Sequence, residues 1–243
     1  MRSEIGELLS TNFSELAIRV NQLDTRVAGI ENRLLSYHRN RWDAIFNLAD
    51  YLVGAELPGD YYEFGVYKGE TFSYAITTMA PLFKEMRFVA LDSFEGLPEL
   101  RGVDLDENYS SGFYQSQFTF SKDGFIANLL KLGIDMNRVI IIKGWFEKNL
   151  NLDTHKSNGL GKIAAAWIDC DLYESTVPVL QYITPHLQPG TVLLFDDWHC
   201  FRNLPDRGQQ RACREWLADN PQIRLNQLFS FGFHGQAFTI GSM

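Results

Sequence analysis

Three aspartates follow two apolar stretches that we expect to be neighbouring strands of a parallel sheet. Asp169 comes directly after KIAAAWI, and Asp196 and Asp197 come directly after TVLLF. The carboxyl ends of adjacent parallel strands meet at one edge of a sheet, so these carboxylates should converge there. Converging like charges repel unless a cation lies between them, and oxygen ligands suit Mg²⁺ or another hard divalent cation. The spacing therefore predicts a metal site formed by Asp169, Asp196 and Asp197.

A second aspartate near the first strand end leaves an alternative open. Asp171 lies two residues beyond Asp169 and could be the ligand in its place. We prefer Asp169 because it directly ends the apolar stretch AAAWI. Either residue could instead cap the helix that follows, which is a common role for Asp.

The stretch DYYEFGVYKGETFSYAI, residues 60–76, carries two glycines four residues apart behind the acidic Glu63. The pattern Glu63-x-Gly65-x-x-x-Gly69 is not the G-x-G-x-x-G of dinucleotide sites, because Glu63 stands where the first glycine would be. It is not a P-loop either, since no Gly-Lys-Ser/Thr follows. Glycine lets the backbone approach a ligand closely, but the pattern alone also fits an ordinary tight turn.

An acidic residue at the end of the next predicted strand indicates which kind of ligand would bind at this turn. Asp92 ends RFVALD, about where an acid binds ribose hydroxyls in nucleoside-binding α/β folds. A ribose acid without pyrophosphate glycines favours a nucleoside that carries no phosphate. S-adenosylmethionine is such a ligand.

Short apolar stretches alternate with helical ones along the chain. The expected strands are 61–66, 87–92, 138–144, 162–169 and 191–197, and the expected helices are GETFSYAITTMAPLF, SKDGFIANLLKLGI, TVPVLQYITPHL and GQQRACREWLADN. This alternation predicts an α/β fold with a mostly parallel sheet covered on both faces. The final stretch, RLNQLFSFGFHGQAFTI, predicts an antiparallel pair of strands that turns near residues 232–235.

One stretch, residues 94–120, interrupts this alternation. It is polar, aromatic and rich in Gly and Ser, and it is too long for an ordinary connection in a compact domain. A disordered surface insertion is one explanation. We favour a lid over the substrate, because its Phe and Tyr residues need a surface to pack on.

The first part of the chain shows a seven-residue repeat over residues 9–37. Apolar side chains occupy the a positions (Phe13, Val20, Val27, Leu34) and the d positions (Leu9, Leu16, Leu23, Ile30, Tyr37). Val at a with Leu at d favours a parallel two-stranded coiled coil, in which Arg19 would face Asp24 and Arg26 would face Glu31. The alternative is one long helix packed on its own domain. We expect residues 1–40 to serve association as a homodimer or higher homo-oligomer, and a helix over about 40–55 to lead into a catalytic domain, residues 41–243.

Five motifs occur in a fixed order after residue 58: E-F-G-V-Y-K-G-E-T, L-D-S-F-E-G-L-P, K-G-W-F-E-K-N-L, I-D-C-D-L-Y-E-S-T and F-D-D-W. Together they resemble the macrocin O-methyltransferase (TylF-type) family over about residues 58–240, with the heptads outside the resemblance. The second and fourth motifs are the specific ones, since the glycine motif alone fits any class I methyltransferase. The resemblance implies a Rossmann-like class I fold, S-adenosylmethionine as cofactor, sugar hydroxyls of macrolides and related glycosides as acceptors, and the same three metal positions.

The strand ends and the resemblance together imply the roles of the remaining site residues. Glu63, Gly65, Gly69 and Thr71 would line the methionine half of the cofactor. Asp92 would hold the ribose, Ser93 and Phe94 would flank the adenine, and Gly144 and Trp145 would cover its other side. Trp145 could equally belong to the core.

Removal of the acceptor proton requires a general base. The candidates are Asp169 and His199, which lies two residues beyond Asp197. Histidine has a suitable unperturbed pKa, although the family usually reads D-D-Y here without this histidine. His234, in FGFHGQAF, is a further candidate that could also be a simple turn residue.

Composition and charge limit the possible binding partners and the cellular compartment of the protein. The formal net charge of −8 over 243 residues disfavours nucleic acid, which binds basic surfaces. Cys170, Cys200 and Cys213 form no C-x-x-C pair, which favours a reduced cytosol. The start MRSEIGELLS does not fit a signal peptide, and no apolar run approaches the roughly 18 residues of a membrane helix, so we expect a cytoplasmic protein.

Three functions fit these observations. The first is a Mg²⁺-assisted O-methyltransferase acting on a sugar or glycoside hydroxyl. The second is a metal-independent methyltransferase acting on another small molecule. The third is a non-catalytic dimeric scaffold of the same fold, which the three retained acidic residues disfavour.

Overall fold

The computed structural model of the protein describes residues 39–105, 112–232 and 234–242, together with Arg19, Val20, Leu23 and Val27. The chain divides into two compact units, Met1–Arg41 and Trp42–Met243. The four described residues ahead of residue 39 are helical, with exposed side chains. The rest of the heptad segment 9–37, and with it the predicted coiled coil, lies outside the described residues.

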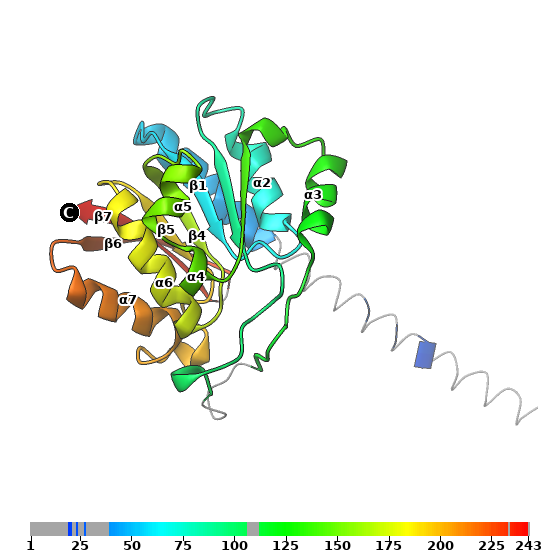
Figure 1. The fold of residues 1–243 in the computed structure, drawn as a ribbon, viewed down its shortest axis with the longest axis vertical. Helices are drawn as coiled ribbons and strands as arrows, with labels where there is room; N and C mark the ends of the chain where they lie inside the picture. The colour runs from blue at the N-terminus through cyan, green and yellow to red at the C-terminus, as the bar shows by residue number, and fades with distance from the viewer. Residues whose placement is uncertain are drawn as a thin grey trace, which may run out of the picture. The chain divides into compact units, whose positions relative to one another are not determined.

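The second unit is built on a seven-stranded sheet with the order β3-β2-β1-β4-β5-β7-β6 (Figure 1). Its strands are β1 (Asp60–Phe64), β2 (Phe88–Asp92), β3 (Val139–Lys143), β4 (Ile163–Ile168), β5 (Val192–Phe195), β6 (Arg224–Phe231) and β7 (Gly235–Ser242). The first five strands run parallel, whereas β7 is antiparallel to both β5 and β6. The predicted α/β fold is therefore confirmed, including the antiparallel C-terminal strand.

Helices cover both faces of this sheet. In Figure 1, α2 and α3 lie on one side of the strands, and α6 and α7 lie on the other. The helices are α2 (Glu70–Met79), α3 (Lys122–Lys131), α4 (Phe146–Asn149), α5 (Leu152–Ser157), α6 (Tyr173–Ile183) and α7 (Gly208–Asp219), with short 3₁₀ turns η1 (Gly102–Leu105), η2 (Met136–Arg138), η3 (Thr184–His186) and η4 (Phe201–Asn203). Residues 42–54 are also helical, as predicted.

The central strands β1, β2, β4 and β5 are mostly apolar because both of their faces are buried. Tyr61 and Tyr62 are neighbours on β1, yet they belong to two different core clusters. The Tyr61 cluster includes side chains from residues 42–54, α2 and α3, whereas the Tyr62 cluster includes side chains from α6 and α7. Successive side chains of a strand point to opposite faces, so one apolar stretch fills both layers.

Two local features differ from the expectation. We expected the helix after the glycine turn to reach residue 83, but α2 ends at Met79, two residues ahead of Pro81. Proline disfavours helical geometry in the residue before it and cannot donate a backbone hydrogen bond. Residues 146–157, for which we expected no helix, form the short helices α4 and α5.

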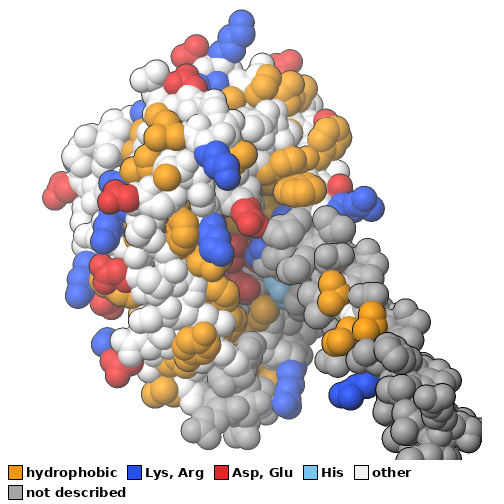
Figure 2. Space-filling view, turned by 90° about the vertical axis from the view of Figure 1, so that its right-hand side faces the viewer, with side chains coloured by type: hydrophobic (Ala, Val, Ile, Leu, Met, Phe, Trp, Pro, Cys, Tyr) orange, Lys and Arg blue, Asp and Glu red, His pale blue; other side chains and the backbone are white. Residues whose placement is uncertain are grey.

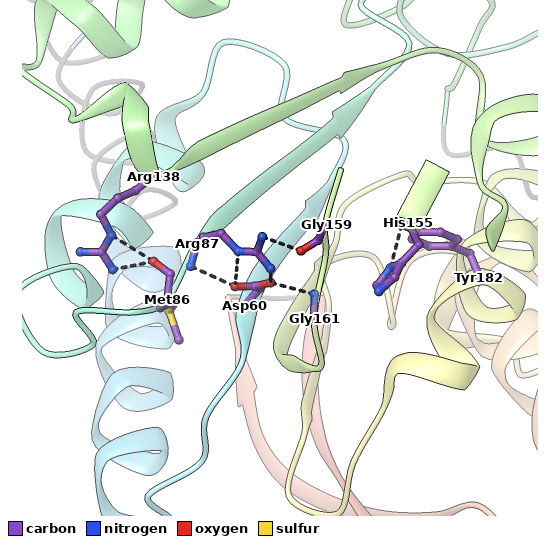
Figure 3. Close-up of polar contacts among 8 residues, drawn as sticks. All are labelled: Asp60, Met86, Arg87, Arg138, His155, Gly159, Gly161 and Tyr182. Carbon is purple, nitrogen blue, oxygen red and sulfur yellow. Dashed lines mark hydrogen bonds and ion pairs between the residues drawn. The ribbon is translucent and has the colours of Figure 1, made fainter. Parts of the chain in front are cut away.

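An ion pair ties together the amino-terminal ends of the central strands (Figure 3). The Arg87 side chain donates to both carboxylate oxygens of Asp60, at 3.2 and 2.6 Å, and to the Gly159 carbonyl at 2.7 Å. The Arg87 and Gly161 backbone N–H groups also donate to the Asp60 carboxylate. Since Asp60 is almost fully buried, these contacts set the alignment of β1, β2 and the turn before β4.

The surface carries both signs of charge. Figure 2 shows basic and acidic side chains interspersed with scattered hydrophobic ones over the face that it draws. Among the described residues, no helix combines the length and the apolar character that crossing a bilayer requires.

A pair of stacked histidines makes folding stability depend on pH. The rings of His155 and His186 are parallel within 3°, with centroids 3.3 Å apart, and the Tyr182 hydroxyl lies 3.5 Å from His155 Nδ1 (Figure 3 draws His155 and Tyr182). Burial, followed by the neighbouring His155 and then Lys162, lowers the pKa of His186 from 6.5 to about 4. Burial also lowers the pKa of His155. Both imidazoles are therefore neutral in the folded protein at neutral pH.

We expect the free energy of unfolding to fall as the pH drops from about 6.5 towards about 4. In this range the unfolded chain binds a proton at His186 more readily than the folded chain does. The contribution of the neutral His186 to the free energy of unfolding is therefore complete above pH 6.5 and is lost as the pH falls towards about 4. Urea unfolding at a series of pH values measures the slope. The variant His186→Asn should show a shallower slope than the parent, and equal slopes would contradict this assignment.

Candidate functional site

The carboxyl ends of β1, β4 and β5 bring the predicted metal residues together. Asp169 N donates to the Phe64 carbonyl at 2.9 Å, and Asp196 N donates to the Ile168 carbonyl at 3.0 Å, so each aspartate directly continues a paired strand. One carboxylate oxygen from each of Asp169, Asp196 and Asp197 lies within 4.8 Å of the others. Asp196 and Asp197 are buried and Asp169 is half-buried. Three buried or half-buried acids at this distance fit a hard divalent cation.

Asp171 belongs to neither group of candidate metal ligands that the described residues form. Its backbone has a left-handed φ of 58°, and its N–H donates to Asp197 Oδ2 at 3.1 Å. The first-turn N–H groups of α6, from Tyr173 and Glu174, donate to the carboxylate of Asp104 at 3.1 and 3.0 Å. Asp104, which is distant in sequence, thus has the capping role that we considered for Asp169 or Asp171.

The glycine turn brings the end of β1 against Asp169, one of the predicted metal residues. Gly65 has φ of +88°, and a Cβ there would lie 1.9 Å from the Asp169 carbonyl oxygen. Gly69 has φ of +85° and is the N-cap of α2, which has no side-chain cap. Its backbone lies so close to the Phe125 ring that a Cβ would come within 2.7 Å. Glycine is therefore required at both positions, and the uncapped start of α2 suits a carboxylate ligand.

Glu63 lies near the end of β1, two residues before Gly65. Its side chain is almost completely buried, and Oε2 accepts a hydrogen bond of 2.6 Å from the Tyr61 hydroxyl. Burial, and then the Glu63 carboxylate, raise the pKa of Tyr61 well above its ordinary value. Tyr61 therefore stays protonated and holds the Glu63 carboxylate in place. Thr71, the second residue of α2, is half-buried.

Asp92 organises the loops around the predicted ribose position. Its Oδ2 accepts from the backbone N–H groups of Val66 at 2.8 Å and Tyr67 at 3.1 Å, and its Oδ1 accepts from Phe94 N–H at 2.7 Å. A carboxylate can accept about four hydrogen bonds. These three bonds therefore leave capacity for about one more donor, such as a ribose hydroxyl.

Of the residues predicted around the adenine, Phe94 is instead part of the core, and the others have mixed surroundings. The Ser93 hydroxyl closes its own turn, since it accepts from Glu95 N and donates to the Gly96 carbonyl, both at 3.0 Å. Phe94 is 5% exposed and packs in the core against Phe125, with ring centroids 5.6 Å apart. Gly144 N donates to the Asp92 carbonyl at 2.8 Å, and Trp145 is half-buried at the start of α4.

The two candidate base histidines lie on different turns. His199 Nδ1 lies 2.8 Å from Asn203 Oδ1, which also accepts from Gln210. His234 Nδ1 lies 2.6 Å from the Asp196 carbonyl oxygen. Since carbonyl oxygens accept, Nδ1 donates in both cases and the ring lone pair is on Nε2. His234 and Cys200 also form a group with Asp197, with ligand atoms within 4.8 Å of one another.

A family model described as macrocin-O-methyltransferase (TylF) matches residues 16–216. The chain belongs to this family. We expected the resemblance to begin near residue 58 and to leave out the heptads, but the match begins inside the heptad segment. The macrocin O-methyltransferase family pattern thus includes residues that precede the sheet.

Several known proteins are similar to this chain. The 8-demethyl-8-(2,3-dimethoxy-alpha-L-rhamnosyl)-tetracenomycin-C 4'-O-methyltransferase of Streptomyces olivaceus is 28% identical over 65% of this chain and 60% of its own length. The chain thus spans about 60% of the length of this relative. Among solved structures, the O-methyltransferase NovP is 22% identical with a TM-score of 0.66, covering 83% of this chain and 80% of that one. The calicheamicin methyltransferase CalS11 is 25% identical with a TM-score of 0.64, covering 82% and 77%.

The segment predicted as a lid, residues 94–120, is hydrogen-bonded at its base in this family member. Leu97 N donates to the Gln117 carbonyl, and Ser116 N donates to the Leu97 carbonyl, both at 2.9 Å. The Phe118 ring lies 5.8 Å from the Tyr67 ring, and the Phe113 ring lies 5.9 Å from the Phe201 ring. The described part of the segment thus touches both the glycine turn and the turn after β5. Residues 106–111 lie outside the described residues.

Sequence reasoning missed Gln209, which bonds the strand ends that carry the predicted metal residues. This side chain, 1% exposed, accepts from Asp197 N at 3.0 Å and donates to the Ile168 carbonyl at 2.9 Å. It therefore clamps the ends of β4 and β5 together from α7. In the sequence, Gln209 is only an amide beside the apolar face of that helix. This pattern is the same for a buried glutamine as for one on the surface.

The variant Gln209→Met should weaken Mg²⁺ binding by about 10- to 100-fold, because it removes both bonds at nearly constant volume. Titration calorimetry with Mg²⁺ measures this change. Gln210→Met is the matched control, because Gln210 bonds the Trp198 carbonyl and Asn203 and contacts no predicted ligand through these bonds. Equal affinities in the two variants would contradict the positioning role of Gln209.

Proposed function

We propose that the protein is an S-adenosylmethionine-dependent O-methyltransferase that methylates a sugar or glycoside hydroxyl with the help of a divalent cation. One observation carries this proposal: in a member of the macrocin O-methyltransferase family, the three aspartates converge directly beside the glycine turn. Gly65, which the predicted methionine site needs, lies against the backbone of Asp169, which the predicted metal site needs. Cofactor and metal would therefore meet at one edge of the sheet.

The cofactor would lie across the ends of β1 and β2. The uncapped start of α2 and the Glu63 carboxylate suit the carboxylate and the amino group of its methionine half. The remaining acceptor capacity of Asp92 suits a ribose hydroxyl, and Ser93, Gly144 and Trp145 would border the adenine, whereas the Phe94 ring is turned into the core. S-adenosylmethionine would supply the methyl group from its positively charged sulfonium.

The residues that would hold the cation are Asp169, Asp196 and Asp197. Their oxygens favour Mg²⁺, which retains places for water and acceptor oxygens. A bound cation would lower the pKa of the acceptor hydroxyl and fix its position. Asp171 and Gln209 support this arrangement through their hydrogen bonds to Asp197.

The chain itself would remove the acceptor proton and exclude water. Asp169 is half-exposed beside the glycine turn, so its carboxylate is a candidate base. His199 is the other candidate, since its Nδ1 donates to Asn203 and its Nε2 is able to accept a proton. Residues 94–120, anchored through Asp104 to α6, would act as the lid, because methyl transfer depends mainly on alignment in a water-poor site.

The acceptor class is inferred from relatives. The relative from Streptomyces olivaceus is named for a methyl transfer to the 4'-oxygen of a rhamnosyl group. Another, from Micromonospora griseorubida and 26% identical, is named for the 3''-oxygen of mycinamicin III. A sugar hydroxyl on a glycoside is the acceptor that these names share with the family resemblance.

We also infer that the heptad segment pairs two copies of the chain as a parallel coiled coil. Val20, Leu23 and Val27, at the predicted a and d positions, are helical and about half-exposed, at 47%, 56% and 51%. A second copy would cover these side chains. Sedimentation that gives the mass of a single chain would contradict this proposal.

Titration calorimetry of the full chain with S-adenosylhomocysteine, with and without Mg²⁺, tests the central proposal. We expect S-adenosylhomocysteine to bind in both conditions. In a separate assay with S-adenosylmethionine as the methyl donor, we expect methyl transfer to a glycoside only when Mg²⁺ is present. Absence of cofactor binding would exclude the enzyme. Transfer that survives a chelator would favour the metal-independent methyltransferase instead.

A further inference from the structure

Cys200 and His234 lie beside the aspartate triad, but the proposed methyl transfer does not use them. Their ligand atoms and a carboxylate oxygen of Asp197 all lie within 4.8 Å of one another. Asp197 is buried, whereas Cys200 and His234 are half-buried. The group therefore combines the buried carboxylate of Asp197 with a thiol and an imidazole that are closer to solvent.

Backbone contacts bring these residues together from two separate turns. Cys200 follows β5, and its N–H donates to the Asp197 carbonyl at 3.1 Å. His234 lies between β6 and β7, and its carbonyl accepts from His199 N at 2.8 Å. Because β7 pairs with β5, the fold itself places the two turns side by side.

The side chains are also oriented by hydrogen bonds. Cys200 Sγ lies 3.6 Å from Asp197 Oδ1, so thiol and carboxylate face each other. His234 donates Nδ1–H to the Asp196 carbonyl at 2.6 Å. Histidines that bind metals typically donate their other ring N–H to a carbonyl or carboxylate, which fixes the tautomer and the ring orientation.

The turn that carries Cys200 has an unusual backbone. Phe201, Arg202 and Asn203 are three successive non-glycine residues with left-handed φ values of 56°, 58° and 58°. Such conformations are unfavourable for non-glycine residues and concentrate at functional sites. The backbone of this turn thus supports a functional role for the position of Cys200.

We propose that Asp197, Cys200 and His234 form a second cation site, which takes a thiophilic divalent ion such as Zn²⁺ and shares Asp197 with the triad. Sulfur and nitrogen ligands select Zn²⁺ or Co²⁺ over Mg²⁺, and three protein ligands leave a fourth position for water. Because Asp197 belongs to both groups, an ion at the second site alters the affinity of the triad for Mg²⁺.

Cobalt(II) absorption spectroscopy of the full chain tests this proposal without cofactor or acceptor. A thiolate ligand gives Co²⁺ a charge-transfer band in the near ultraviolet, which oxygen ligands do not give. We expect this band in the parent protein, its loss in Cys200→Ser, and Co²⁺ affinity at least about tenfold weaker in His234→Gln. Zn²⁺ should displace the Co²⁺ and abolish the band.

Two control variants separate this site from the other thiols and from the triad. Cys213→Ala removes a buried thiol on α7 and should keep the band. Asp169→Asn removes a triad ligand that the second site does not use, and it should also keep the band. Absence of the band in the parent, its survival in Cys200→Ser, or its loss in Asp169→Asn would overturn the proposal. The outcome does not depend on methyl transfer, so failure of the proposed enzyme activity would be seen separately.

Discussion

Asp196→Asn is expected to lower the rate of methyl transfer by about a thousandfold. Metal coordination contributes several kcal/mol to transition-state stabilisation, and about 4 kcal/mol corresponds to this factor. Asp196 is 2% exposed, and its carboxylate is within 4.8 Å of those of Asp169 and Asp197, so no other oxygen can easily replace it. Initial rates with a glycoside acceptor, measured across Mg²⁺ concentrations, give the change.

The melting temperature of Asp196→Asn distinguishes a loss of metal binding from misfolding of the variant. Removal of one of three crowded negative charges relieves repulsion, so we expect the melting temperature of the metal-free protein to stay the same or rise. Asp219→Asn, at an exposed position at the end of α7, is the control and should keep full activity. An Asp196→Asn enzyme with more than a tenth of the parent rate and the same Mg²⁺ dependence would contradict the metal assignment.

Gly65→Ala is the second substitution from which we expect a large effect. A methyl group at this position would lie 1.9 Å from the Asp169 carbonyl oxygen, and φ of +88° is unfavourable for alanine. Backbone strain and overpacking together should lower the free energy of unfolding by about 3 kcal/mol. The displaced ends of β1 and β4 should also reduce methyl transfer by about a hundredfold in the protein that remains folded.

Gly133→Ala is the matched control for this substitution. Gly133 has a similar φ of +74°, but nothing lies within 4 Å of a Cβ placed there. We therefore expect only the strain of the left-handed conformation, about 1 kcal/mol, and an unchanged rate. Urea unfolding and initial rates compare the two variants. Equal losses of stability would show that the contact with Asp169 does not matter.

Much of the fold could be predicted because its signals are local. The parallel strands are short, mostly apolar stretches, and most of them are followed by a helical pattern, so the positions of the strands along the chain are plain in the sequence. Helix ends were less certain, since the effect of Pro81 on α2 competes with an apolar pattern that continues to residue 83. Helices as short as α4 and α5 leave too little periodicity to detect.

The candidate site was predictable only in part. Residues at the ends of strands or directly after them, such as Asp92, Asp169 and Asp196, could be assigned to one edge of the sheet because parallel strands share a direction. In contrast, the neighbours of a side chain depend on contacts between residues that are far apart in sequence. Asp104 caps α6 from 69 residues away in sequence, and Phe94 turns into the core beside Phe125. Neither contact leaves a local pattern.

The sequence by itself determined the fold class, the edge of the sheet that carries the site, the acidic residues at that edge and the family resemblance. These follow from hydrophobic periodicity and from residue types at strand ends, which act over a few neighbouring residues. Only the tertiary structure decided that Asp169 rather than Asp171 faces Asp196 and Asp197, that Gln209 clamps them, and that His234 and Cys200 meet beside them. Those placements arise when β7 pairs with β5 and α7 packs on the sheet, because such pairing brings together residues whose separation in sequence carries no information about their distance.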